Sequence, residues 1–370
     1  MVQINTSNYP QLVFSTSTPQ ANFEFFTASG TIVPAWIESY TSPTLTIWVK
    51  LVNGIAANST TTIYLGIGSS SANFLSSAGT SGIGIAPQLG PVYAQYDNGN
   101  SVFNNYWNWA GTTIPPNWSA GSGISVSANN KLTIASNTNN VGYLYEGTTI
   151  SAPFVLEGYG EATTATTGSI SLGLAYLNVL STSGDGNASS LGGPWIWGAS
   201  PFSWEGFTSS IINFSLGGGP PTPALNTWYI LGLADSGTNA YWYVNYNLLG
   251  TKTTSSGSDY IGFWADASDT QIYYWLRTRA YPPSGTAPTN TFGSVIYNIY
   301  IDTIKFRYGL QLSDYIKFRY GLQINPNIEF RYGLQLSDYI KFRYGLQINP
   351  NIEFRYGLQV VSNFNFNNYL

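Results

Sequence analysis

The chain has 370 residues and a formal net charge of −4, with 8% charged, 43% hydrophobic and 16% aromatic residues. It contains no Cys and no His, which excludes disulfides, thiolate or imidazole metal sites and hydrolases of the Ser-His-Asp type. A charged fraction well below the usual value of about 25% implies a surface of Ser, Thr, Asn, Gln, Gly and Tyr, which changes little in acid.

The start of the sequence leaves two alternatives for the location of the protein. Residues 1–6 lack the basic and apolar regions of a secretory signal peptide. Either the numbering begins after a removed signal, or the protein leaves the cell in a virus particle. No stretch approaches the roughly 18 consecutive apolar residues of a membrane span. The expected location is therefore extracellular or on the virion surface.

Residues 1–91 are predicted to form an N-terminal β-sandwich domain. Segments 45–51 and 60–66 alternate between apolar and polar residues, as strands do. The boundary is placed near Gly90-Pro91, after a Ser/Gly-rich stretch at 69–84. The order and spacing of three blocks resemble an uncharacterised β-domain of archaeal and bacterial surface proteins, and these blocks are residues 23–31, 34–38 and 47–50. The resemblance implies location and architecture, and no activity.

Residues 92–303 resemble the concanavalin A-like lectin/glucanase superfamily. The segments that carry the resemblance are residues 103–106, 115–118, 124–127, 131–134, 226–230, 240–246, 275–283 and 300–307. The resemblance implies a jelly-roll sandwich of two sheets whose concave face often binds glycans. Short runs of β-branched and aromatic residues, broken by Gly, Pro, Asn and Ser, independently predict an all-β chain.

Residues 304–370 contain a 12-residue repeat. The hexapeptide Phe-Arg-Tyr-Gly-Leu-Gln begins at Phe306, Phe318, Phe330, Phe342 and Phe354. The linkers alternate between Leu-Ser-Asp-Tyr-Ile-Lys and Ile-Asn-Pro-Asn-Ile-Glu, so the full unit contains two hexapeptides and one copy of each linker. A parallel solenoid with a 12-residue rung would stack like-charged Arg residues at strand spacing, which is unfavourable. A hairpin about Asp314 would instead place Arg307 opposite Gly321. The prediction is an antiparallel β-meander, with the solenoid as the alternative.

One face of each predicted repeat strand is apolar and would be covered by other copies of the chain. A sheet with one wet aromatic face forgoes much hydrophobic stabilisation. The expected partner is the chain itself, as a homo-oligomer, and the alternative is an inert duplication. From Lys305 onward there are eight basic and four acidic residues, against five and thirteen before it, which favours association between copies over nucleic-acid binding. The predicted assembly face consists of Phe306, Tyr308, Leu310, Phe318, Tyr320, Phe330, Tyr332, Phe342, Tyr344, Phe354 and Tyr356.

Catalytic and metal sites are not expected. A glycanase needs two carboxylates about 5.5 to 9.5 Å apart, and the nearest pair on one strand face, Glu157 and Glu161, would be about 13 Å apart at strand spacing. The Asp-containing segments 97–100, 185–187 and 266–269 could be calcium loops, but ordinary turn chemistry explains them better. No cofactor is implied.

A Trp-rich segment bounded by Gly and Pro supplies the glycan-binding candidates, which are Trp195, Trp197, Trp204 and Glu205. Aromatic rings beside amide and carboxylate groups suit sugars, and Trp195 and Trp197 share a strand face. Core packing is the competing interpretation of these rings.

The sequence as a whole predicts a non-enzymatic structural or adhesion protein. It would belong to an extracellular appendage or virion surface, assemble through its C-terminal repeats, and carry a lectin-like domain with cell-surface glycans as a second partner. A monomeric carbohydrate-binding surface protein is the alternative, and a glycoside hydrolase is the third.

Overall fold

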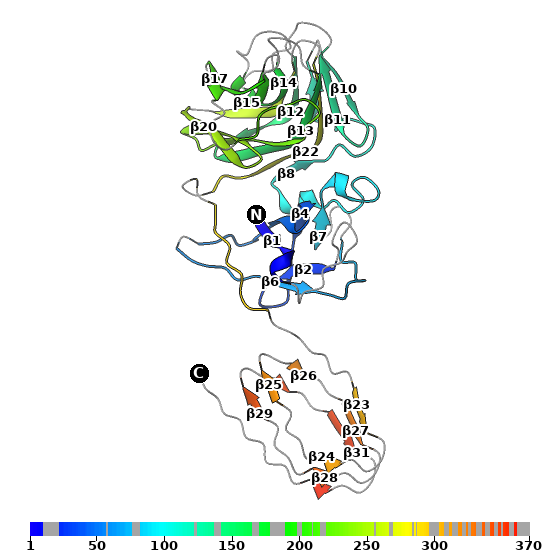
Figure 1. Cartoon of the computed structure of the whole chain (residues 1–370). Coiled ribbons are helices and arrows are strands. Elements are labelled where there is room, and N and C mark those ends of the chain that lie inside the picture. Colours follow the sequence, from blue (N-terminus) through cyan, green and yellow to red (C-terminus); the bar gives the residue numbers. More distant parts are fainter. Residues whose placement is uncertain are drawn as a thin grey trace. The chain divides into compact units, whose positions relative to one another are not determined.

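The computed structural model gives two compact units, residues 1–288 and 289–370. The described residues are 1–9, 22–56, 58–75, 82–121, 124–136, 142–164, 170–177, 189–197, 202–208, 210–214, 220–254, 257–265, 269–282, 285, 287–295 and the ten strands β23 to β32 between 303 and 360 (Figure 1).

The chain is nearly all β, as the strand pattern predicts. In β19 (Asn239–Val244), Ala240, Trp242 and Val244 are buried and alternate with half-buried residues, which is the period of a strand with one face in the core. In the described part of the chain, helix is limited to α1 (Gly99–Val102) and the 3-10 turns η1 (Thr6–Asn8) and η2 (Pro87–Leu89).

The N-terminal strands form two sheets around one core. The four-stranded sheet has the order β1 (Val2–Asn5), β5 (Thr44–Val49), β4 (Ala35–Thr41) and β7 (Ile83–Ile85). The three-stranded sheet has the order β3 (Ile32–Val33), β2 (Phe23–Phe26) and β6 (Tyr64–Ile67). Apolar residues of both sheets, among them Phe23, Phe25, Ile37 and Ile47, pack into one buried cluster. This arrangement is the predicted sandwich.

The jelly roll consists of two large antiparallel sheets. The eight-stranded sheet has the order β10 (Ile124–Ala128), β11 (Leu132–Ser136), β22 (Thr270–Ala280), β13 (Phe154–Thr164), β18 (Tyr229–Asp235), β19 and β20 (Asn247–Thr253), and β8 (Asn105–Trp107) also pairs with β22. The seven-stranded sheet has the order β17 (Ile211–Phe214), β16 (Ser203–Phe207), β15 (Ser189–Trp197), β14 (Ile170–Leu177), β21 (Ser258–Ala265), β12 (Gly142–Ser151) and β9 (Trp118–Ala120).

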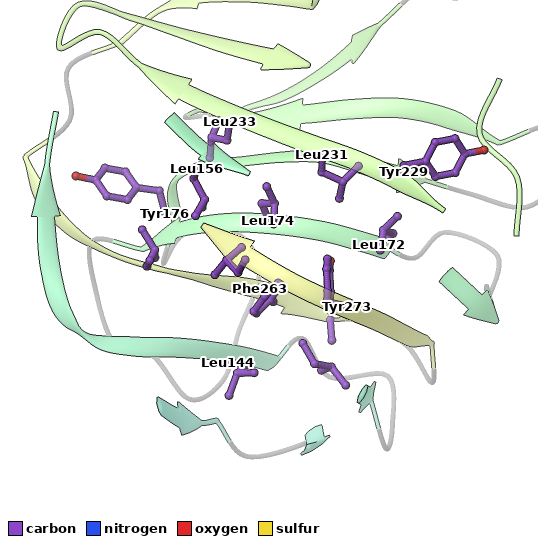
Figure 2. Packing of buried hydrophobic residues seen from close by; sticks show 14 of the residues in the cluster. Leu144, Leu156, Leu172, Leu174, Tyr176, Tyr229, Leu231, Leu233, Phe263 and Tyr273 are labelled. Atoms are coloured by element: carbon purple, nitrogen blue, oxygen red, sulfur yellow. The ribbon is translucent and has the colours of Figure 1, made fainter. Parts of the chain in front are cut away.

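The two large sheets meet face to face through their apolar sides. Figure 2 shows Leu156, Leu231 and Leu233 of the eight-stranded sheet opposite Leu174 and Phe263 of the seven-stranded sheet, and all five belong to one buried cluster. Each strand contributes every second residue to this core, so the opposite side of each sheet is free to carry other side chains.

A further cluster joins the N-terminal sheets to the jelly roll. Trp36 of β4 contacts Phe103 and Trp275 edge-to-face, with ring centroids 5.2 and 5.6 Å apart. These rings are buried. The predicted boundary at residue 91 thus lies inside one compact unit, and the limits 1–91, 92–303 and 304–370 remain predictions.

The repeats form a parallel solenoid, which we term the coil, so the predicted antiparallel meander is wrong. The sheet β23 (Thr303–Phe306), β27 (Asn327–Phe330) and β31 (Asn351–Phe354) is parallel, and its register advances by one full unit from strand to strand. The same advance pairs β24 (Gln311–Leu312), β28 (Gln335–Leu336) and β32 (Gln359–Val360). It also pairs β25 (Lys317–Arg319) with β29 (Lys341–Arg343), and β26 (Gln323–Ile324) with β30 (Gln347–Ile348).

The physical reason lies in the alternating linkers. A coil that spans the full unit places each linker beside an identical linker, whereas a 12-residue rung would stack unlike ones. Like charges at neighbouring strand positions destabilise a sheet by roughly 0.2–1 kcal/mol per pair. The register contains three such pairs, Lys317 with Lys341, Arg319 with Arg343 and Glu329 with Glu353, and one pair of opposite charge, Lys305 with Glu329. The parallel arrangement forms in spite of these like charges, so the prediction gave the like-charge penalty too much weight.

Candidate functional site

A row of aromatic residues with one carboxylate crosses the outer face of the seven-stranded sheet. Glu205 of β16 pairs with Trp195 of β15, and Trp195 pairs with Gly173 of β14. On the next two strands, Trp264 of β21 pairs with Tyr143 of β12. These five residues, which we term the outer aromatic row, alternate along their strands with residues of the central core. They therefore lie on the side of the sheet that faces away from that core.

The glycine in the outer aromatic row lets its two tryptophans meet. A Cβ at Gly173 would lie 2.2 Å from Cδ1 of Trp195, so no other residue leaves room for the ring. The rings of Trp195 and Trp264 pack edge-to-face with centroids 4.5 Å apart. The indole Nε1 of Trp195 donates to the carbonyl oxygen of Leu174 at 3.2 Å. The Trp195 ring is thus held in one orientation.

Two polar atoms of the outer aromatic row have no hydrogen-bond partner within the described ranges. These are Oε2 of Glu205 and Nε1 of Trp264, whose residues are 3% and 4% exposed. The other carboxylate oxygen of Glu205 lies 3.5 Å from the hydroxyl of Ser203. Burial raises the pKa of Glu205 to about 7, although the Ser203 hydroxyl lowers it slightly. A hydrogen-bond acceptor and a donor therefore flank Trp195.

The margin of the outer aromatic row is less buried than its centre. Phe207 stacks near-parallel on Trp195 with ring centroids 6.0 Å apart. At the other end, Tyr145 and Tyr260 contact each other at 6.2 Å. All three marginal rings are half-buried, so solvent reaches the aromatic face at its edges.

The four predicted glycan-binding residues do not all share this face. Trp195 and Glu205 lie next to each other on it. Trp204 points into the central core, where its Nε1 donates to the carbonyl oxygen of Pro221 at 2.6 Å, because it is one residue out of phase with Glu205. The backbone of Trp197 pairs with Ser203, and its side chain lies outside the described residues.

Four further aromatic residues were not predicted from the sequence. The register of β12, β16 and β21 brings Trp264 and Tyr143 into the row and places Tyr145 and Phe207 at its margin. The side chains of the predicted assembly face lie outside the described residues, so that prediction is not tested.

A buried arginine connects three carboxylate and hydroxyl groups on the other large sheet. Nε of Arg277 bonds to Glu157 at 2.8 Å, and its Nη2 bonds to Glu38 of β4 at 2.8 Å. The same Nη2 donates to the hydroxyl of Tyr246 at 2.9 Å, and that hydroxyl donates to Glu38. Arg279 adds a 2.8 Å bond to Glu157. We term these five residues the arginine clamp, and it joins the four-stranded sheet to the eight-stranded sheet.

Four aromatic rings surround the guanidinium of Arg277. Its central carbon lies 4.4 to 5.3 Å from the ring centroids of Phe103, Trp48, Trp275 and Trp36. Such rings stabilise a desolvated cation through their negative faces. The arginine clamp is therefore a structural centre.

The arginine clamp explains the role of Glu157, which the sequence places with Glu161 as the nearest candidate for a catalytic pair. Burial opposes ionisation of Glu157, but Arg279 and Arg277 outweigh it and lower its pKa to about 2. An acid catalyst must carry a proton at its working pH, and a carboxyl group with a pKa of about 2 is ionised at neutral pH. Glu205 has the raised pKa of an acid catalyst, but it is the only carboxylate in the outer aromatic row, and glycanases use two.

Asp97, in one of the three possible calcium loops, is a hydrogen-bond acceptor for the protein itself. Its carboxylate accepts from Trp36, Tyr106 and Asn108 at 2.8 Å and from the backbone of Gly99 at 3.0 Å. The candidate segments 185–187 and 266–268 lie outside the described residues.

Residues 20–114 match the model of a domain of unknown function, DUF2341. This range includes the three blocks on which the N-terminal resemblance rests. Uncharacterized protein 562 of Sulfolobus islandicus rod-shaped virus 1 is 26% identical over 325 residues, which are 78% of this chain and 54% of the viral protein. The chain thus spans about half the length of that relative.

Among solved structures, the jelly roll is similar to two glucanases and one lectin domain. The β-glucanase of Bacillus licheniformis is 14% identical with a TM-score of 0.34, over 47% of this chain and 97% of the other. The endo-β-1,3-glucanase of Pyrococcus furiosus is 12% identical with a TM-score of 0.34, over 48% and 94%. The carbohydrate recognition domain of Emp47p is 12% identical with a TM-score of 0.34, over 45% and 90%. Within the described ranges, no helix has the length and apolar character needed to cross a bilayer.

Proposed function

We propose that this chain is a non-enzymatic structural or adhesion protein of a virion surface or extracellular appendage, and that its jelly roll contacts glycans. The observation that carries the glycan part is the outer aromatic row, in which Oε2 of Glu205 and Nε1 of Trp264 have no partner among the described residues on either side of Trp195. Unpaired buried polar atoms are unfavourable, and a ligand that bonds to both would remove that penalty.

The chemistry of the row suits a saccharide. Sugar hydroxyls both donate and accept hydrogen bonds, which matches one carboxyl group and one indole NH. The apolar face of a sugar ring can lie against an aromatic ring such as Phe207 at the half-buried margin. Ligand sites in general combine aromatic walls with a few fixed polar groups. A ligand would approach the row from its half-buried margin, at Phe207, Tyr145 and Tyr260.

The location part of the proposal rests on two observations. The viral relative shares 26% identity over 78% of this chain, which favours a virion protein over a cellular one. A charged fraction of 8% and the absence of Cys and His leave few groups that acid or oxidants could alter. Both properties suit a protein exposed outside a cell.

The assembly part of the proposal is supported by the coil. The three-stranded parallel sheets end in strands β23 and β31 on one side and β24 and β32 on another. The edge of such a sheet is a template for pairing with another chain. We therefore propose that the coil is the part of the protein that joins copies.

The glycan proposal is tested on a glycan array with the full chain, the Glu205→Gln variant and the Trp264→Phe variant. Both substitutions should weaken binding at least about tenfold, since each removes one of the two unengaged atoms. The matched control is Tyr64→Ala, which changes an aromatic residue that is 45% exposed on the N-terminal sheets. Unchanged binding by both row variants would refute the outer aromatic row as the site.

The assembly and enzyme parts have separate tests. Deleting residues 313–370 should convert oligomers to monomers, as measured by light scattering. If the wild-type protein is itself a monomer, the assembly proposal is wrong and the alternative of a monomeric carbohydrate-binding protein remains. Release of reducing sugar by the wild-type protein that a folded Glu205→Gln variant no longer shows would establish that the protein is a hydrolase.

A further inference from the structure

A second group of aromatic rings lies on the outer face of the eight-stranded sheet. Tyr159 of β13, Tyr274 of β22 and Trp228, just before β18, are half-buried. Trp228 stacks on Tyr274 with centroids 4.2 Å apart and planes at 16°. Tyr159 lies 5.0 Å from Trp228 and 6.1 Å from Tyr274. We term these three rings the outer platform, and it faces the opposite way from the outer aromatic row.

Two local features of the backbone build the outer platform. Asn226 has a φ of 52° and its backbone NH donates to the carbonyl oxygen of Ala162 at 2.8 Å. This bond fixes the turn that carries Trp228 beside β13. In β22, the pairing with β13 skips one residue, Tyr274. A bulge of this kind re-aims a side chain, and here it brings Tyr274 against Trp228.

The polar groups around the outer platform are free to bond to a ligand. In the part of the chain that the structure describes, the hydroxyls of Tyr159 and Tyr274, the indole NH of Trp228 and the carboxylate of Glu161 form no hydrogen bond. Lys131 interacts with Glu161 through its charge. Glu161 follows Tyr159 by two residues on β13. Burial, with the charges of Tyr274, Glu38 and Glu161, raises the pKa of Tyr159 to about 12. Burial and Glu161 also raise the pKa of Tyr274.

The neighbouring rings on the same face have a different environment. Trp275, which stacks on Tyr159 at 5.7 Å, is fully buried between the sheets and the arginine clamp. Its role is packing. Tyr159 and Tyr274 pack on one side against the edge of the buried cluster that contains Trp275, and Tyr93 lies 6.1 Å from Tyr274. All three rings of the outer platform are nevertheless exposed in part, so packing within the chain uses only part of their surface.

We propose that the outer platform is a second saccharide-binding site. The ring of Trp228 takes the apolar face of a sugar residue. Its indole NH and the two tyrosine hydroxyls bond to sugar oxygens, and the carboxylate of Glu161 accepts from sugar hydroxyls. A site with aromatic walls and a few fixed polar groups is the usual arrangement for a small polar ligand. With sites on opposite faces of one sandwich, a single chain bridges two glycan strands, which strengthens attachment through multivalency.

The test uses the full chain and a panel of hexasaccharides of β-1,3-glucan, β-1,4-glucan, α-mannan and chitin. Binding is followed by isothermal titration calorimetry and by quenching of tryptophan fluorescence. Trp228→Ala and Tyr274→Ala should each weaken binding of at least one probe by at least about tenfold, as expected for central aromatic contacts. Glu161→Gln should weaken the same probe several-fold. Tyr64→Ala is the control for an exposed aromatic residue elsewhere.

The outcomes separate this proposal from the outer aromatic row. If Trp228→Ala lowers affinity and Glu205→Gln does not, the outer platform binds alone. If the reverse holds, or if wild-type protein binds none of the probes at millimolar concentration, the outer platform is not a saccharide site. Tyr274→Phe keeps the stacked ring and should lose less affinity than Tyr274→Ala, and circular dichroism shows that each variant is folded.

Discussion

Arg277 is fully buried, and it is ion-paired with two carboxylates from different parts of the chain. Its bonds to Glu157 and Glu38 span 120 and 239 positions in sequence. Burying three charges is unfavourable unless each finds its partners. Tyr246, in a two-residue turn with positive φ at both positions, brings its hydroxyl to the same centre. Each member of the clamp thus depends on the others.

Replacing Arg277 should therefore strongly destabilise the folded protein. Arg277→Met leaves Glu38 and Glu157 as buried carboxylates without their shared cation, so we expect the free energy of unfolding to fall by about 3–5 kcal/mol. Urea unfolding of the full chain measures it. Arg279→Met is the control, because the side chain of Arg279 is 24% exposed and its loss leaves the Arg277 bonds in place. Equal effects of the two variants would contradict the central position of Arg277.

The raised pKa of Glu205 predicts that the free energy of unfolding depends on pH. Burial raises its pKa from 4.5 to about 7 in the folded chain, so the folded state favours the protonated form. The stabilisation that Glu205 contributes is full below about pH 4.5 and is lost as the pH rises through 7. Wild type and Glu205→Gln should thus have similar pH profiles below pH 4.5 and diverge up to pH 8, with the variant gaining in relative stability. Denaturant unfolding at five pH values tests this, and parallel profiles would refute it.

At the scale of the element, the packing of aromatic rings over β14 depends on Gly173, which has no side chain. Gly173 sits between Trp195 and Trp264 in the outer aromatic row, and the two rings meet over it. We expect Gly173→Ala to displace the Trp195 ring, since the new Cβ would approach it to 2.2 Å. Overpacking of this kind typically destabilises by about 1–3 kcal/mol.

The Gly173 prediction is checked by thermal unfolding and by the fluorescence spectrum of the tryptophans. Gly257→Ala is the matched control, because its Cβ would meet nothing closer than 3.9 Å. A Gly173→Ala variant as stable as Gly257→Ala would mean that the ring moves without penalty.

Strands could be predicted from the sequence, but their partners could not. Alternation along one segment places Trp195 and Glu205 on outward faces once the strands are aligned. It cannot reveal that Trp264, far along the chain, lies beside Trp195, because that contact depends on β14 lying between them. Trp204 was misplaced for a related reason, since adjacent residues of a strand point to opposite faces. The arginine clamp gave one weak signal, the pair Arg277 and Arg279 directly after the apolar run 272–276 of β22.

At the scale of the whole molecule, the strand pairing of the repeats advances by one full unit, which contains two hexapeptides and two linkers. Removing residues 327–350 deletes one full coil and leaves identical linkers in register, so we expect a folded, shorter coil. Removing residues 319–330, which is half a unit, stacks unlike linkers and should lower both the strand signal and the unfolding temperature. Far-UV circular dichroism of the two deletion variants distinguishes them. If the half-unit deletion is tolerated equally well, the coil follows the shorter repeat.

The direction of strand pairing in the repeats could not be obtained from charge alone. The like-charge argument compared Arg residues pairwise and favoured reversal of the chain. It left out that only the full unit matches both linkers, and that Lys305 then lies beside Glu329. Exact repetition favours parallel stacking, because in β25 with β29 and in β27 with β31 each residue pairs with its own copy.

The arginine clamp also determines how this protein can be divided or recombined. A shortened chain that starts at residue 92 keeps Arg277, Trp275 and Glu157 but loses Glu38, Trp36 and Trp48, so Arg277 would keep one of its two carboxylate partners and lose two of its four surrounding rings. A fusion of the jelly roll to a different N-terminal domain would also need side chains equivalent to Glu38, Trp36 and Trp48. Residues 1–280 should therefore be kept together when the protein is shortened or fused to another domain.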